Sequence, residues 1–443
     1  MTNCLLINPQ VPFATPASAD AWIKHGLASL SASLKQAGHS TSLLDFRLIP
    51  SWGSVIPHVA RINPDVVFIT AVTSERDAAI TTAKMIKRYD PNIVTCVGGI
   101  HASIAPQDFW EGFDFIIKGE GEITVPNIAS ELKETPKWAI SPVVQWGKVP
   151  DLNTIPHPDR ELWPDYMERC QHPPLWLREK PWVDILNYRG CSGKCKFCVG
   201  PGEQNHFKPI RGKSVERVID EMLILDSKYH FKSYNYGDDQ AIMNVQWMWD
   251  FCKALKENGL DGKQWWAGSR ADVILRNKDL VLEMQRRGLD IMSVGFESFS
   301  QHHLDFWNKG TTVEQNVEAA MFLKDHGIRI FSNVIFGAPR EDGKYYPEDD
   351  RKNIEMLQKI RPEFNSWSIF TATPGCELYK WAQEKNLIVA NDNGWRGANE
   401  NKVRGVSVRR VRLLGDEAMA GQINSRPWYH TWHDRFRLLL DGD

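Results

Sequence analysis

Short apolar runs alternate with amphipathic stretches along the first 136 residues of the chain. The apolar runs predict strands at 4–7, 41–46, 66–70, 93–97 and 113–117. Between the strands, apolar spacing predicts a helix over 26–37 that ends at Gly38, and a second helix near 78–88. The run at 66–70 is apolar almost throughout, which is typical of a strand buried on both faces. This alternation predicts a doubly wound parallel sheet.

Small or polar loops follow three of these predicted strands. They are Ala71-Val72-Thr73-Ser74, Gly98-Gly99 and Gly119-Glu120-Gly121-Glu122. In open α/β sheets, ligands bind outside the carboxyl ends of the strands, where glycine lets the backbone approach closely. A tight turn is the simpler interpretation of each loop taken singly. The three loops together predict a binding site for a sizeable ligand.

The alternation of strands and helices returns after residue 181. Strands are expected at 183–186, 233–236, 264–267, 291–296, 329–336 and 367–371. Six such units predict an open (β/α)6 barrel, with its active site at the carboxyl ends of the strands. The intervening stretch is rich in proline and tryptophan, which predicts an irregular connector. We therefore expect four parts, namely 1–136, a linker at 137–180, a barrel at 181–380 and a C-terminal extension at 381–443.

Composition narrows the possible settings of the protein. A chain of 443 residues suggests two or three domains, and a net charge of −2 gives no general attraction to nucleic acid or anionic membranes. We find no apolar run long enough to span a bilayer and no secretory signal, so a cytoplasmic protein is expected. Five scattered cysteines suit free thiols in a reducing compartment, namely Cys4, Cys96, Cys170, Cys252 and Cys376.

The remaining three cysteines are closely spaced. Cys191, Cys195 and Cys198 form a CX3CX2C triplet just after the first strand of the barrel. Three thiolates at this spacing can hold a 4Fe-4S cluster and leave its fourth iron open for chemistry. Structural zinc is the alternative, but zinc sites usually close with a fourth Cys or His at short spacing, and the next histidine is His206.

The triplet and its surroundings resemble the radical S-adenosylmethionine (SAM) superfamily over about residues 182–378. The resemblance implies that the open iron binds SAM, that Phe197 flanks the adenine, and that Glu297 accepts from the ribose or from Arg270. It assigns SAM binding to Phe197, Asp238, Asp239, Ser269, Arg270, Glu297, Asn333, Ile335 and Gly337. A helix cap, a structural salt bridge or core packing remains the alternative for single residues of this set. Lys309-Gly310-Thr311-Thr312 is interpreted as a turn followed by a threonine helix cap.

The first third of the chain resembles the cobalamin-binding domain of cobalamin-dependent radical SAM enzymes. The matching segments are His25-Gly26-Leu27-Ala28, Ala37-Gly38-His39, Asp45, Gly98-Gly99-Ile100-His101 and Gly119-Glu120-Gly121-Glu122. The resemblance implies cobalamin binding by Thr70, Ala71, Val72, Thr73, Ser74, Gly98, Gly99, His101, Gly119, Glu120 and Gly121. No DXHXXG motif offers a lower axial histidine, so we expect base-off cobalamin with its lower face against 70–74. His39 and His101 are interpreted as loop residues with local hydrogen bonds.

This double resemblance implies a methyltransferase that acts on an unactivated carbon of a small molecule or of a peptide or protein side chain. It implies three cofactors (a 4Fe-4S cluster, SAM and cobalamin), the use of methylcobalamin and a 5'-deoxyadenosyl radical, and an electron donor of the flavodoxin or ferredoxin type. No general base is assigned. Two alternatives stay open: a cobalamin-dependent cyclase or rearrangement enzyme that transfers no methyl group, and a cobalamin or iron-sulfur sensor without catalysis.

Overall fold

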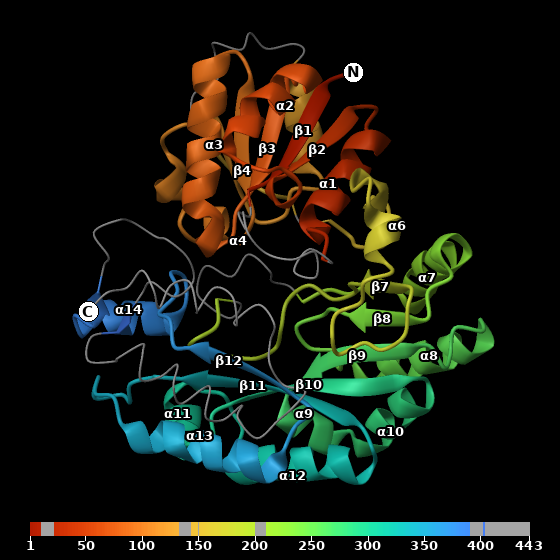
Figure 1. The fold of residues 1–443 in the computed structure, drawn as a ribbon, viewed down its shortest axis with the longest axis vertical. Coiled ribbons are helices and arrows are strands. Elements are labelled where there is room, and N and C mark those ends of the chain that lie inside the picture. The colour runs from red at the N-terminus through yellow and green to blue at the C-terminus, as the bar shows by residue number, and fades with distance from the viewer. Residues whose placement is uncertain (10–21, 133–142, 149, 200–209, 390–401, 404–443) are drawn as a thin grey trace. The chain divides into compact units, whose positions relative to one another are not determined.

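A computed structural model describes residues 1–9, 22–132, 143–148, 150–199, 210–389 and 402–403 (Figure 1). The chain divides into two compact units. Among the described residues, the first unit runs from Met1 to Arg169, and the second runs from Cys170 to Val389 with residues 402 and 403. Most of the predicted C-terminal extension lies outside the described residues. None of the helices within the described ranges has the length and apolar character needed to cross a lipid bilayer.

The first unit is built on a parallel sheet in the order β2-β1-β3-β4-β5-β6. The strands are β1 (Asn3–Asn8), β2 (Ser40–Asp45), β3 (Val66–Thr70), β4 (Val94–Gly98), β5 (Phe115–Lys118) and β6 (Val143–Trp146). Because β1 lies between β2 and β3, the strand order reverses beside β1. Such a reversal is where ligands bind in doubly wound sheets.

Helices pack against this sheet through apolar residues. The helices of this unit are α1 (His25–Gln36), α2 (Val55–Ile62), α3 (Arg76–Tyr89), α4 (Ile100–Ile104), α5 (Thr124–Glu131) and the short α6 (Tyr166–Arg169), which is not part of the buried cluster described next. Leu5, Ile7 and Ile69 from the central strands form one buried cluster with Val59 of α2 and Ile86 of α3. Each such side chain contributes roughly 1.5–3 kcal/mol when fully buried. The predicted doubly wound sheet is confirmed.

One part of the expected linker is regular rather than irregular. Residues 143–146 form β6, which pairs in parallel with β5 from Phe115↔Val143 to Lys118↔Trp146. The Lys118 ammonium lies 4.3 Å from the centroid of the Trp146 ring. Valine and tryptophan favour strands when a neighbouring strand is available. The proline-rich composition of the stretch concealed this edge strand.

The second unit holds six parallel strands in strict chain order, from β7 to β12. They are β7 (Trp182–Ile185), β8 (Ser233–Tyr236), β9 (Gln264–Ser269), β10 (Leu289–Glu297), β11 (Arg329–Phe336) and β12 (Phe364–Ile369). Among the described strands, β7 and β12 are the two edges of this sheet, and Figure 1 shows the curvature of the strands between them. The predicted open barrel is confirmed.

Helices follow the barrel strands and form its outer layer (Figure 1). They are α7 (Val215–Tyr229), α8 (Val245–Glu257), α9 (Ala271–Arg276), α10 (Lys278–Arg286), α11 (Gln301–Phe306), α12 (Val313–Asp325), α13 (Pro347–Ile360) and α14 (Glu377–Glu384). A short antiparallel pair, β13 (Ile388–Val389) and β14 (Lys402–Val403), follows. Ser214, Asn244 and Thr312 begin their helices by accepting a hydrogen bond from a first-turn amide. The predicted threonine cap is thus confirmed.

Candidate functional site

The cysteine triplet lies on a loop that follows β7. The Lys196 amide donates to the Trp307 carbonyl at 2.8 Å, and the Leu378 amide donates to the Lys196 carbonyl at 3.1 Å. The loop is therefore anchored between the end of α11 and the start of α14. A methyl group added to Gly193 would lie 3.4 Å from the sulfur of Cys191 and 3.7 Å from that of Cys195, so both sulfurs face this glycine.

Positive charge surrounds the buried thiol of this triplet. The Arg270 Nη1 donates to the Cys195 sulfur at 3.5 Å. Burial raises the pKa of the Cys195 thiol, and the charges of Lys309 and Arg270 oppose that rise. Cations near a thiol favour the thiolate, which is the form that binds iron. Cys198, in contrast, is exposed.

The three thiols fit a cluster better than a single ion. No three His, Cys, Asp or Glu side chains of the described residues are grouped closely enough to hold one metal ion. In an iron-sulfur cluster each thiolate binds a different iron, so the sulfurs surround the cluster rather than one point. A single loop with three thiols and neighbouring cations therefore suits a 4Fe-4S cluster.

A buried lysine also lies near the cysteine triplet. Lys309 is only 4% exposed, and its ammonium donates to the Glu297 Oε1 at 3.1 Å. It lies 5.9 Å from the centroid of the Phe197 ring, which packs edge-on against Trp307. The turn that the sequence predicts at Lys309 does not indicate its burial. The signal available in the sequence was its position two residues after the apolar pair Phe306-Trp307, since a lysine among apolar residues is buried only with a charged partner.

The structure pairs Glu297 with Lys309, and the suggested pairing of Glu297 with Arg270 is wrong. The Arg270 Nε donates to Asp272 at 2.9 Å, and its Nη2 donates to the Lys309 carbonyl. Glu297 has a positive φ of 62°, an uncommon backbone conformation for glutamate. Arg270 and Glu297 are thus connected through Lys309, by its backbone and its side chain respectively.

Asp238 holds the start of the cysteine loop. Its Oδ1 accepts from the Asn187 amide at 2.7 Å, and its Oδ2 accepts from the Tyr188 amide at 2.9 Å. The side chain is 3% exposed, and burial raises the pKa of Asp238 to about 7. Asp239, the next residue, is exposed. The predicted acidic pair therefore divides into a buried residue that orients backbone and an exposed residue available to a ligand.

The other residues predicted to bind SAM lie at the ends of β9 and β11. The buried Ser269 hydroxyl accepts from the Gln240 side chain at 3.0 Å, and the Asn333 amide donates to Ser293 at 2.9 Å. Ile335 packs against the apolar cluster that contains Trp307 and Phe197. Gly337 directly follows β11 with a φ of 70°. The roles of these residues in SAM binding remain predictions.

In the first unit, the predicted cobalamin loops approach one another through backbone. The Ala71 amide donates to the Gly98 carbonyl at 2.9 Å, and the His101 amide donates to the Ala71 carbonyl at 3.1 Å. Gly99 has a φ of 96°, and a methyl group there would lie 2.8 Å from the Ala71 oxygen. Only glycine fits this position. The result is a cradle of backbone groups at the carboxyl ends of β3 and β4, which suits a large cofactor.

Local hydrogen bonds hold the side chains of these loops. The buried His101 ring contacts the Thr73 hydroxyl at 3.2 Å and the Asp108 carboxylate at 3.1 Å, as expected for a locally bonded histidine. His39, in contrast, contacts the Ser130 hydroxyl at 3.0 Å, on a helix far from it in the sequence, so its predicted local bonding is wrong. At the end of β5, the Gly119 amide donates to Ser103 at 2.9 Å, and Glu120 is buried. Cobalamin binding by individual loop residues remains a prediction.

Comparison with known proteins identifies both domains. Residues 17–129 match the B12 binding domain, and residues 186–351 match the radical SAM superfamily. An uncharacterized methyltransferase of Pyrococcus horikoshii is 28% identical over 84% of this chain and 80% of its own length. The anaerobic magnesium-protoporphyrin IX monomethyl ester cyclase of Rubrivivax gelatinosus is 27% identical over 86% of this chain and 70% of its own length.

Solved structures share the same fold. OxsB, a cobalamin-dependent SAM radical enzyme with aqua-cobalamin and SAM bound, matches 95% of this chain with a TM-score of 0.71 and 16% identity, and the chain spans 66% of that protein. The radical SAM methyltransferase TsrM from Kitasatospora setae matches 89% of this chain and 77% of its own, with a TM-score of 0.66 and 18% identity. The chain thus combines a cobalamin-binding domain with a radical SAM domain, and it uses a 4Fe-4S cluster, SAM and cobalamin.

Proposed function

We propose that the protein methylates an unactivated carbon of its substrate, which is a small molecule or a side chain of a peptide or protein. The observation that carries this proposal is the cysteine loop beside Arg270 and Lys309 in a chain that also has a backbone cradle for cobalamin. The relative with 28% identity is named a methyltransferase and the relative with 27% identity a cyclase. Methyl transfer is therefore the first candidate, and cyclisation without methyl transfer is the second.

The cysteine loop and the side chains beside it have separate roles in this proposal. When bound, the reduced cluster with SAM supplies a group that removes a hydrogen atom, and cobalamin supplies the methyl group. Cys191, Cys195 and Cys198 would hold the cluster. Arg270 and Lys309 would stabilise the Cys195 thiolate and neutralise an anionic ligand group beside it. Phe197 offers an apolar surface for the adenine ring, supported from behind by Trp307.

Enzymes of the radical SAM family need a reductant as well as a substrate. We propose an electron carrier of the flavodoxin or ferredoxin type for this protein. Cys198 is exposed, as is the neighbouring Lys194, so one side of the cluster loop is accessible to a partner with an acidic surface. A carrier of this type and the free thiols of the chain both suit a reducing, cytoplasmic compartment.

Turnover with labelled SAM tests the proposed function. The full chain is reconstituted anaerobically with iron, sulfide and cobalamin, reduced, and given SAM with a deuterated methyl group together with products of neighbouring genes. We expect 5'-deoxyadenosine and a product that carries the labelled methyl group. 5'-Deoxyadenosine with an unlabelled product would indicate cyclisation or rearrangement, and the absence of both would indicate a sensor.

Two variants connect this activity to the triplet. Cys195→Ala is expected to lower the iron content and to abolish 5'-deoxyadenosine formation. Cys252→Ala removes another buried cysteine, on α8 and outside the triplet, and is expected to retain both. A Cys195→Ala protein with full iron content and activity would contradict the assignment of the cluster to this loop.

A further inference from the structure

The first turns of α13 contain three buried polar residues that contact other elements. Asp349, Asp350 and Asn353 are at most 1% exposed. Acidic residues in a first helical turn usually face solvent and interact with the helix dipole. Here the side chains instead contact segments at the carboxyl ends of β10 and β11, which include Gly337. This arrangement calls for an explanation because burial of a carboxylate is costly.

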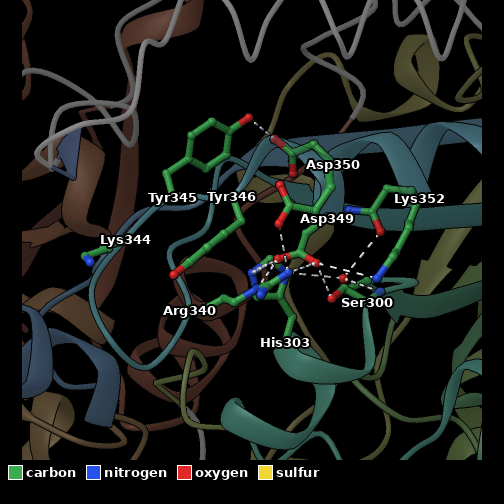
Figure 2. Close-up of polar contacts among 12 residues, drawn as sticks. Ser300, His303, Arg340, Lys344, Tyr345, Tyr346, Asp349, Asp350 and Lys352 are labelled. Carbon is green, nitrogen blue, oxygen red and sulfur yellow. Dashed lines mark hydrogen bonds and ion pairs between the residues drawn. The ribbon is translucent and has the colours of Figure 1, made fainter.

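Asp350 binds the peptide that follows β11. Its two oxygens lie 3.1 and 3.0 Å from the Gly337 amide, which donates to both, and its Oδ2 accepts from the Tyr345 hydroxyl at 2.7 Å. Figure 2 shows the tyrosine contact. Burial raises the pKa of Asp350 to about 6, and the adjacent Asp349 adds to the rise. Among the residues that the structure describes, no lysine or arginine is paired with Asp350, and its carboxylate accepts from an amide and a hydroxyl.

The adjacent Asp349, in contrast to Asp350, lies beside a cation. It accepts from the Arg340 guanidinium at 2.8 Å and from the Ser300 hydroxyl at 2.6 Å, and the His303 ring lies 3.7 Å away (Figure 2). Burial alone would raise the pKa of Asp349, but the hydrogen bonds from Arg340 and Ser300 outweigh it and the pKa is lowered. Asp349 therefore forms an ion pair with Arg340. Asp350 is buried at a cost, and the Gly337 amide and the Tyr345 hydroxyl donate to it.

Asn353 extends the same contacts by one helical turn. Its side-chain oxygen accepts from the Phe299 amide at 2.6 Å and from the Ser298 hydroxyl at 3.3 Å. Its amide donates to the Ile335 carbonyl at 3.4 Å. The segment that follows Glu297 and the end of β11 are thus attached to one rigid helix.

We propose that Asp350 is a positioning residue for SAM, because it fixes the Gly337 peptide at the end of β11, with Asp349 and Asn353 holding the segment after β10 in the same way. The inference rests on the proposed function and on the predicted binding of SAM by Gly337 and Glu297. A positive φ at Gly337 gives this peptide conformational freedom, and two hydrogen bonds to one carboxylate remove it. Binding is then favoured because the site is ordered before SAM arrives.

The test compares SAM binding by variants of the reconstituted full chain. Asp350→Ala removes the acceptor of the Gly337 amide. We expect the dissociation constant for SAM, measured by anaerobic calorimetry, to rise about tenfold, with unchanged iron content and faster hydrogen exchange of the Gly337 amide. Asp350→Asn keeps one acceptor oxygen and is expected to bind SAM within about threefold of the wild type.

A neighbouring residue gives a matched control. Asp342 also accepts from a backbone amide and a tyrosine hydroxyl, that of Lys344 at 2.9 Å and that of Tyr346 at 2.7 Å, but it is exposed and makes no contact with a strand end. Asp342→Ala is expected to leave SAM affinity unchanged. Equal weakening by Asp342→Ala and Asp350→Ala would overturn the proposal.

Two further outcomes test the positioning role of Asp350. If Asp350→Ala speeds exchange at Gly337 but binds SAM as the wild type does, Asp350 only supports the fold and the proposal is wrong. If Asp350→Ala does not fold, Tyr345→Phe provides the test, because it removes one donor to Asp350. We expect Tyr345→Phe to raise the dissociation constant for SAM about threefold. An unchanged constant would overturn the proposal. Failure of the wild type itself to bind SAM would contradict the proposed function instead.

Discussion

The two units shape the ends of their strands by different means. In the first unit, backbone meets backbone: the loops after β3 and β4 exchange amide hydrogen bonds, and Gly99 leaves no room for a side chain. In the second unit, buried carboxylates hold the loops. Asp238 accepts from two consecutive amides after β7, and Asp350 accepts from the amide after β11. The first arrangement depends mainly on the steric fit at Gly99, with one buried carboxylate, Glu75, accepting from the Val72 amide at 3.1 Å. The second depends on charge.

This difference has a consequence for stability. A glycine in a tight turn costs only conformational entropy in the unfolded chain. A buried carboxylate loses hydration, and the raised pKa values of Asp238, about 7, and Asp350, about 6, record that loss. We therefore expect substitutions in the first unit to act mainly on folding, and substitutions of the carboxylates in the second unit to act mainly on local order.

Gly99→Ala should have the largest effect. The added methyl group would lie 2.8 Å from the Ala71 oxygen at a backbone φ of 96°, so we expect a loss of roughly 2–4 kcal/mol and of cobalamin retention. Chemical unfolding and the absorbance of bound cobalamin measure the two effects. Gly98→Ala is the control for stability, because its methyl group would have only ordinary contacts at 3.8 Å. Equal stability of the two variants would contradict the steric explanation.

The dependence of stability on pH should be opposite in direction to that of an ordinary salt bridge. Between the unfolded pKa of 3.8 and the folded pKa of about 7, Asp238 holds a proton in the folded state but not in the unfolded state. Folding stability from this residue therefore falls as pH rises through that range. Relative to Asp238→Asn, the wild type should lose up to about 3 kcal/mol from pH 4 to pH 7. Unfolding curves of both proteins across this range measure it, and a rising difference would contradict the assignment.

Lys309→Met should have the next largest effect. It leaves the Glu297 carboxylate, whose side chain is 16% exposed, without its cation, and we expect a loss of about 2 kcal/mol. Adding Glu297→Gln should recover part of this loss, because the uncompensated charge is then gone. A double-mutant cycle of unfolding free energies measures the coupling, expected at about 1 kcal/mol or more. Additive effects would show that the two side chains act independently.

Asp238→Asn should change global stability least at neutral pH, because the lost hydrogen bond and the removed buried charge offset each other to within about 1 kcal/mol. Its effect should be local. We expect faster amide exchange at Asn187 and Tyr188 and lower iron content after reconstitution. Asp239→Asn changes the exposed neighbour and should leave both properties as in the wild type. Normal iron content in Asp238→Asn would show that the cysteine loop does not need this carboxylate.

The local pattern of the sequence was sufficient for most elements of both sheets. The strands at 66–70, 233–236 and 329–336 have the bounds that the apolar runs predict, and the cysteine triplet identifies its own chemistry. Such features depend on neighbours along the chain, namely side-chain periodicity, turn residues and thiol spacing. The edge strand β6 was missed because its pairing with β5 matters more than its own composition.

The sequence by itself determined the doubly wound sheet and the open barrel, and it predicted the cofactor loops and the role of the three thiols. Only the tertiary structure decided the partners of the charged side chains: Lys309 with Glu297, Asp238 with the amides after β7, and Asp350 with Gly337. The two residues of the Asp238 contact lie about fifty positions apart and meet through the pairing of β7 with β8. Strand register and helix placement arise from the packing of the whole core, and no local stretch of sequence contains that information.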